Sequence, residues 1–112
     1  MRATSHVSRR VVIHLDEAER FVLPWHDEWA HQTHRRSGNF RVRWIHATIR
    51  MDRDGEPRVT LTADGVRIRK DGQDSAVQQH GQPVSTDDLP AAVVDEIRAT
   101  LSAQTLPVGD LP

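Results

Sequence analysis

Hydrophobic residues follow a strand-like pattern near the start of the chain. Val11, Ile13 and Leu15 recur at every second position, which is typical of a half-buried strand. A run of acidic residues interrupts this pattern, and it resumes at residues 21–23. We therefore predict a hairpin made by residues 9–15 and 21–24.

A helix is predicted over residues 25–36. Pro24 suits the first turn of a helix, and Gly38 suits the left-handed position that ends one. Trp25 and Trp29 are four residues apart and would share one face of this helix. We expect both tryptophans to anchor the hydrophobic core.

Residues 39–80 have the pattern of an antiparallel meander. The dipeptide Asp-Gly, a strong hairpin signal, occurs at 54–55, 64–65 and 71–72. The predicted strands are residues 40–50, 58–63, 66–70 and 75–80.

A final helix is predicted over residues 88–104, with Asp87 or Asp88 as the N-cap and Pro90 in the first turn. Its hydrophobic stripe follows steps of three and four residues. The stripe consists of Leu89, Val93, Val94, Ile97 and Leu101.

Together these elements predict an α+β fold, with an antiparallel meander of about four to six strands packed on one face by two helices. A length of 112 residues suits one domain. We assign residues 9–104 to that domain, residues 1–8 to a flexible N-terminus and residues 105–112 to a C-terminal tail.

The hydrophobic pattern changes phase inside the first strand of the meander. Phe40, Val42 and Trp44 share one face, but the pattern then shifts by one residue to Ile45 and Ala47. A β-bulge near Trp44 would keep both groups on the core side, because a bulge inserts one extra residue into a strand. His46 and His14 would then lie on the polar face.

The polar face of the predicted meander is rich in arginine and carries no acidic residue. Arginine suits phosphate and carboxylate because its planar fork bonds both oxygens at once. The face also has no aromatic residue, so a nucleic acid would be held mainly through its phosphates, with weak sequence specificity. The predicted anion-binding residues are Arg41, Arg43, Arg50, Arg58, Arg67 and Arg69.

Charge is unevenly distributed along the chain. Residues 1–50 carry a net charge of +4 and residues 51–112 a net charge of −5, which points to an anionic partner at the basic end. A competing explanation is a general preference for arginine, since the chain has fourteen arginines and one lysine. In that case the arginine face is simply solvated.

The composition excludes several classes of protein. The absence of cysteine rules out disulfides and a thiolate nucleophile. No apolar run is long enough for a membrane span or a secretory signal, so we expect a cytoplasmic protein with no membrane contact.

A weak metal-binding pattern lies in the predicted first helix. Asp27, His31 and His34 are spaced at i, i+4 and i+7 and would share one helix face, which could bind zinc. No fourth ligand is identifiable, and the solvated face of an amphipathic helix explains the same residues. We predict no cofactor.

The sequence favours a non-enzymatic binding protein, because it contains no glycine-rich phosphate loop and no nucleophile motif. The predicted partner is anionic, either nucleic acid or an acidic protein surface. The alternatives are a structural protein acting as a homo-oligomer or complex subunit, and a metal-dependent protein.

Overall fold

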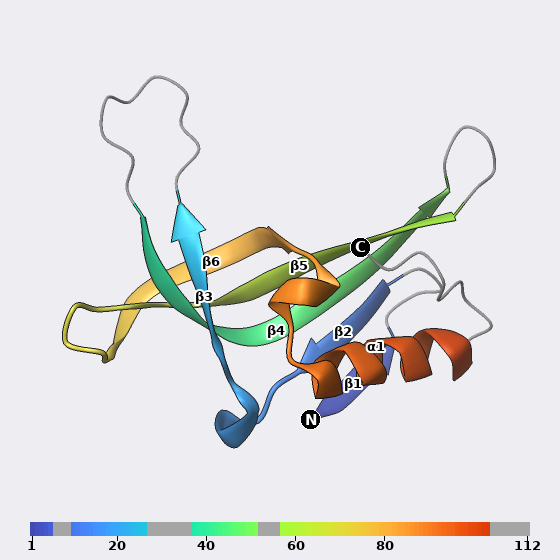
Figure 1. Ribbon diagram of the computed structural model, residues 1–112, viewed down its shortest axis with the longest axis horizontal. Helices are drawn as coiled ribbons and strands as arrows, with labels where there is room; N and C mark the ends of the chain where they lie inside the picture. The colour runs from blue at the N-terminus through green and yellow to red at the C-terminus, as the bar shows by residue number, and fades with distance from the viewer. Residues whose placement is uncertain (6–9, 27–36, 52–56, 104–112) are drawn as a thin grey trace.

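The computed structural model describes residues 1–5, 10–26, 37–51 and 57–103. These residues form one antiparallel sheet with one α-helix (Figure 1). The elements are β1 (Arg2–Ser5), β2 (Arg10–His14), the 3-10 turn η1 (Glu17–Glu19), β3 (Val22–His26), β4 (Ser37–Met51), β5 (Pro57–Ile68), β6 (Asp74–Val84), the 3-10 turn η2 (Thr86–Asp88) and α1 (Ala91–Ala103).

The long strand β4 organises the sheet. The strand order is β1-β2-β4-β5-β6, and β3 also pairs with β4. Strand β2 pairs with residues 44–48 of β4, and β3 pairs with residues 37–41. The predicted hairpin between β2 and β3 is therefore wrong, because the two strands lie one after the other along the same edge of β4. Residues 2–5, predicted to be flexible, form β1 instead.

The predicted helix over residues 25–36 is wrong at its start. Trp25 and His26 belong to β3, and Trp25 is the register partner of Gly38. Gly38 lies within β4 and does not end a helix. Residues 27–36, including Trp29, lie outside the described part of the chain. Trp25 does pack against the hydrophobic core, where it is partly buried.

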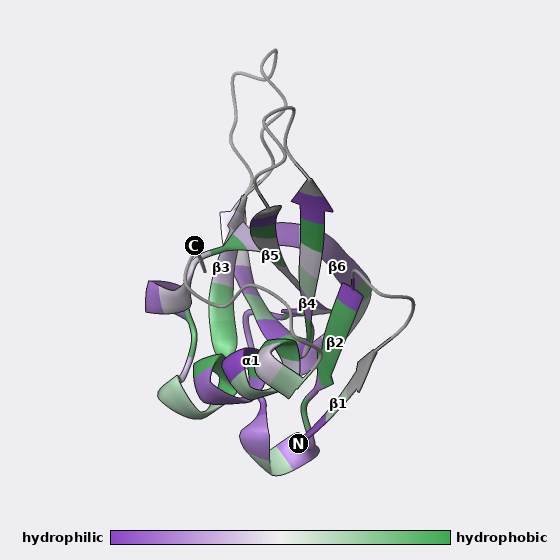
Figure 2. Cartoon of the chain, turned by 90° about the vertical axis from the view of Figure 1, so that its right-hand side faces the viewer, coloured by the Kyte–Doolittle hydropathy of each residue, from purple (hydrophilic) through white to green (hydrophobic). Residues whose placement is uncertain are grey.

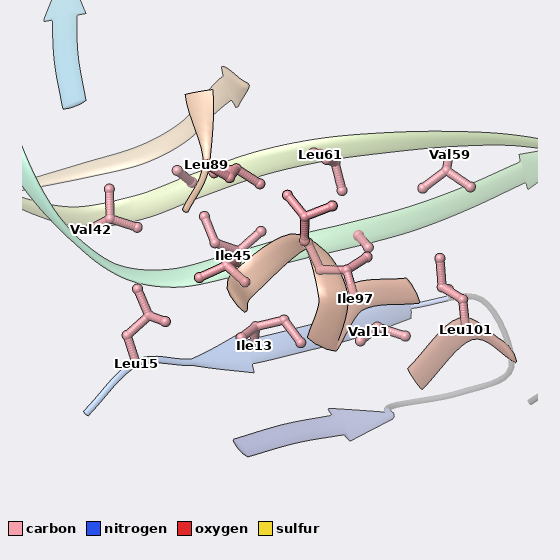
Figure 3. Packing of buried hydrophobic residues seen from close by; sticks show 14 of the residues in the cluster. Val11, Ile13, Leu15, Val42, Ile45, Val59, Leu61, Leu89, Ile97 and Leu101 are labelled. Carbon is pink, nitrogen blue, oxygen red and sulfur yellow. The ribbon is translucent and has the colours of Figure 1, made fainter. Parts of the chain in front are cut away.

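The final helix is confirmed, and its hydrophobic stripe fills the core. Ile97 and Leu101 are fully buried against β2, β4 and β5 (Figure 3). Figure 2 shows β2 as an almost continuous hydrophobic segment, and α1 packs beside it. No helix within 1–5, 10–26, 37–51 and 57–103 is long and apolar enough to cross a membrane.

The predicted β-bulge near Trp44 is confirmed in β4. Val42 pairs with Gly65, and Trp44 pairs with Asp64, so Arg43 is the extra residue. The hydrophobic residues on both sides of the bulge are buried in the core, as predicted: Phe40, Val42, Ile45 and Ala47. Trp44 is on the other side of the sheet, because the shift comes before it rather than after it.

Of the three Asp-Gly dipeptides, only that at 71–72 forms the predicted turn in the described residues. Gly72 has a φ of 84° and its N–H bonds the carbonyl of Arg69. The pair Asp64-Gly65 lies inside β5, which continues to Ile68. A Cβ on Gly65 would lie 1.9 Å from the carbonyl oxygen of Arg41, so glycine here permits a close approach of two strands. Residues 54–55 lie outside the described ranges.

Candidate functional site

The sheet has two faces of different character. We call the face covered by α1 the inner face and the opposite one the outer face. Residues paired across neighbouring strands share a face, so the registers assign each side chain. The outer face carries Arg10, Val12 and His14 on β2, Arg41, Arg43, Trp44, His46, Thr48 and Arg50 on β4, Arg58, Thr60, Thr62, Asp64 and Val66 on β5, and Asp74 on β6.

Arg41 and Arg43 share the carboxylate of Asp74 at the end of the outer face that is nearest the start of β4. Arg41 Nε donates to Asp74 Oδ1 at 3.0 Å, and Arg43 Nη2 donates to Asp74 Oδ2 at 3.5 Å. The hydrogen bond from Arg41 lowers the pKa of Asp74, with the charge of Arg43 adding to the effect. Two guanidinium groups against one carboxylate leave one positive charge in excess, and several N–H donors remain for an anion.

A cleft of about 460 Å³ adjoins this ion pair, and we call it the end cleft. Its lining adds a third arginine, Arg20, which follows η1. The Nε atoms of Arg20 and Arg43 are buried without a hydrogen-bond partner among the described residues. The cleft is lined by Glu17, Arg20, Arg41, Gly72, Gln73 and Asp74.

Arg50 and Arg58 mark the other end of the outer face. They are direct register partners on β4 and β5, and both are exposed. Arg69 lies apart from them, beside the β5–β6 turn, where its Nη2 is 3.0 Å from Asp71 Oδ2.

Arg67 does not belong to the outer face, contrary to the prediction. Its register partner is Phe40, a fully buried core residue, so Arg67 is on the inner face. The guanidinium carbon lies 3.5 Å from the centroid of the Trp25 ring, and Nε donates to Gln79 Oε1 at 3.0 Å. Arg67 therefore covers one end of the core through a cation–π contact.

The middle of the outer face holds a chain of hydrogen bonds. Arg10 Nη2 lies 2.7 Å from His46 Nδ1, and His46 Nε2 lies 3.1 Å from Asp64 Oδ2. A guanidinium can only donate, so Nδ1 accepts, and the ring proton is on Nε2, where it bonds Asp64. Both nitrogens of His46 are thus engaged by the protein. The prediction that His46 lies on the polar face is confirmed.

Asp64 lies between two irregularities of the sheet. Arg43 is the extra residue in β4, and His80 and Gly81 of β6 together face the single residue Asp64. Gly81, with a φ of 64°, donates its N–H to Asp64 Oδ1 at 2.7 Å. His80 Nδ1 is 3.7 Å from Asp64 Oδ2. Bulges are frequent beside functional sites because they redirect side chains.

A hollow of about 380 Å³ opens at this point, and we call it the central hollow. Trp44 forms part of its wall and is only partly buried. The hollow is lined by Arg10, Val12, His14, Trp44, His46 and Asp64. Its volume lies within the range of ~300–1,000 Å³ that is usual for small-molecule sites.

The predicted arginine face is corrected in two further respects. It carries Asp64, which was expected in a turn but lies inside β5, and Asp74, which is at the end of a strand as expected but bonds Arg41 on this face. It also carries an aromatic residue, Trp44. The position of the bulge places Trp44 on this face, and the continuation of β5 through Asp64-Gly65 places Asp64 there.

The weak metal candidates Asp27, His31 and His34 lie outside the described residues. Within the described ranges, no group of three or more His, Cys, Asp or Glu side chains is arranged to hold a metal ion.

Arg10, Arg20 and Trp44 line the two sites but were not predicted as site residues. Arg10 begins β2, and only the pairing of β2 with β4 brings it to His46. Arg20 follows a turn without strand periodicity. The sequence did contain a signal for Trp44. The hydrophobic pattern changes phase beside it, and a bulge at Arg43 would have placed Trp44 on the polar face.

The chain matches no protein-family model, no curated protein and no solved structure, so the role of the outer face is inferred from its own geometry.

Proposed function

We propose that this chain is a non-enzymatic binding protein and that its outer face binds the phosphate backbone of a nucleic acid. The observation that carries the proposal is the placement of cationic side chains along β4. Arg41 and Arg43 lie at one end and Arg50 at the other, about 23–30 Å away along the strand at ~3.3 Å per residue. A polyanion with charges spread along its length fits this spacing better than a single small anion.

The charge balance of the outer face supports this proposal. Two carboxylates, Asp64 and Asp74, are each engaged by cations or N–H donors. The facing pair Arg50 and Arg58 adds a second cationic end, and both side chains are exposed, so a phosphate can approach either guanidinium group. The arginines assigned to this face are Arg10, Arg41, Arg43, Arg50 and Arg58.

A binding role is favoured over catalysis by the state of His46. A general base needs a ring nitrogen that can take a proton from the substrate. Arg10 occupies Nδ1 and Asp64 accepts the proton on Nε2, so His46 acts as a link between two charged side chains. This arrangement orients the Arg10 guanidinium at the hollow.

Fluorescence anisotropy with short labelled oligonucleotides, measured from low to high salt, tests the proposal. We expect log affinity to fall linearly with log salt, with a slope of ~0.7–0.9 per phosphate contact. The double variant Arg50→Ser/Arg58→Ser should show a weaker affinity and a shallower slope. Arg98→Ser, which removes an exposed charge from α1, is the matched control and should leave both unchanged.

Two outcomes would overturn the proposal. One is the absence of oligonucleotide binding at low salt. The other is equal competition by polyglutamate of matched charge, which would assign the outer face to an acidic protein partner instead.

A second candidate function is assembly through strand β6. Within the described residues β6 pairs only with β5, and its Val77 is 51% exposed. An unpaired strand edge with an exposed hydrophobic residue can add a strand from another chain. Light scattering of the wild type and of Val77→Glu tests this role, which requires an oligomer that the substitution dissociates.

A further inference from the structure

We propose that the central hollow is a nucleobase subsite, and that the ligand of the outer face is a single-stranded nucleic acid. This inference rests on the proposed function and specifies the ligand class. It depends on three features of the hollow: an aromatic wall, an oriented cation and a position between two cationic ends of the face.

The aromatic wall is Trp44. Its register partner is Asp64, and Val12 lies beside it in the wall of the hollow. Trp44 belongs neither to the hydrophobic core cluster nor to the partly buried residues packed against that cluster, so packing in the core does not explain its presence there. It remains only partly buried and lines the hollow. Single-strand binding proteins place bases on such aromatic rings, because every base offers a flat π-face for stacking.

The oriented cation is Arg10. One of its terminal nitrogens is held 2.7 Å from His46 Nδ1, and His46 is held in turn by Asp64, 3.1 Å from Nε2. Asp64 is fixed by the backbone N–H of Gly81 at 2.7 Å. This relay holds the guanidinium at the rim of the hollow, where its other N–H groups can bond the acceptor edge of a base.

The position of the hollow favours a single strand over a duplex. Along β4, Trp44 and His46 come between the cationic groups at Arg41 and Arg50. A chain whose phosphates follow these arginines passes over the hollow and can turn a base into it. In a duplex the bases are stacked and paired, so none can enter without being flipped out.

The test compares three ligands of equal length by anisotropy: oligo-dT, an abasic oligomer with the same phosphates, and a duplex. We expect wild-type protein to bind oligo-dT more tightly than the abasic oligomer by roughly 5- to 150-fold, the range for one stacked base. Trp44→Leu should lower the affinity for oligo-dT to the abasic level and leave the abasic affinity unchanged. Trp44→Phe should retain part of the preference.

Trp25→Phe is the matched control, because Trp25 is on the inner face beside Arg67. It should keep the full preference for oligo-dT, and circular dichroism should show that every variant folds. Equal wild-type affinity for oligo-dT and the abasic oligomer would overturn the base subsite while leaving phosphate binding intact. An equal loss of both ligands in Trp44→Leu would also overturn it. Binding to none of the three ligands would instead reject the proposed function itself.

Discussion

Trp44 pairs with Asp64 across β4 and β5, while Val42, two residues earlier, pairs with Gly65. This pairing places the tryptophan on the outer face and the valine in the core. The two residues would otherwise point to the same side, because side chains in a regular strand alternate. The extra residue Arg43 thus creates a site that combines an aromatic ring with arginines.

Because Arg67 is on the inner face, we expect its substitution to change the stability of the protein but not its affinity for nucleic acid. Arg67→Met removes the cation–π contact with Trp25, which should lower the free energy of unfolding by about 0.5–2 kcal/mol. Its effect on oligonucleotide affinity should be small. Arg50→Met should do the reverse, because Arg50 is exposed on the outer face.

Urea unfolding and anisotropy measured on the same two variants check this prediction. A loss of affinity in Arg67→Met equal to that in Arg50→Met, with no loss of stability, would contradict the assignment.

Gly65 is expected to tolerate substitution worse than Gly72. A Cβ at Gly65 would lie 1.9 Å from the carbonyl oxygen of Arg41, so Gly65→Ala must push two paired strands apart. We expect a loss of about 3 kcal/mol. Gly72 has a positive φ but open space around it, so Gly72→Ala should cost only about 1–2 kcal/mol. Thermal unfolding ranks the two variants, and the reverse order would show that β4 and β5 do not approach as described.

The ion pair of Asp74 predicts a pH dependence of stability. Arg41 lowers the pKa of this carboxyl in the folded protein, so the unfolded chain takes up its proton first as the pH falls. The stabilisation is present at neutral pH and is lost from about pH 5 downwards. Asp74→Asn removes it, so the gap in unfolding free energy between wild type and variant should narrow as the pH falls. Urea titrations from neutral to acid pH measure the gap, and a constant gap would contradict the pairing.

The packing of α1 predicts a large effect at Ile97. This side chain is fully buried in the core, so Ile97→Ala should lower the free energy of unfolding by about 2–5 kcal/mol. Arg98→Ala, next to it but exposed, should change stability by less than about 0.5 kcal/mol. Denaturant unfolding of both variants checks the orientation of α1, and similar effects of the two would contradict it.

The sequence predicts correctly those parts of the fold that depend only on the spacing of hydrophobic residues within one segment. The stripe of α1 and the buried sets on either side of the bulge follow directly from the spacing of hydrophobic residues. The position of the bulge is less determined, because either Arg43 or Trp44 could be the extra residue. Only the pairing with β5 decides between them, and that one-residue difference changes the chemistry of the outer face.

Elements that depend on distant partners were predicted less well. Asp64-Gly65 has the composition of a turn, but β5 passes through it because Gly65 lies against β4. Pro24 and Gly38 have the spacing expected of helix ends, yet β3 and β4 pair there. Arg10 and His46 are far apart in the sequence, so their contact could not be inferred from local pattern.

The most direct test of binding at the outer face is a titration of ¹⁵N-labelled protein with a single-stranded oligonucleotide, followed by NMR. The three tryptophans give three indole signals, assigned by Trp25→Phe and Trp44→Phe. We expect the Trp44 indole and the backbone amides of β4 and β5 around Asp64 to shift, with the signals of Trp25 and of the exposed side of α1 unchanged. Shifts confined to α1, or no shifts at all, would contradict a nucleic-acid site on the outer face.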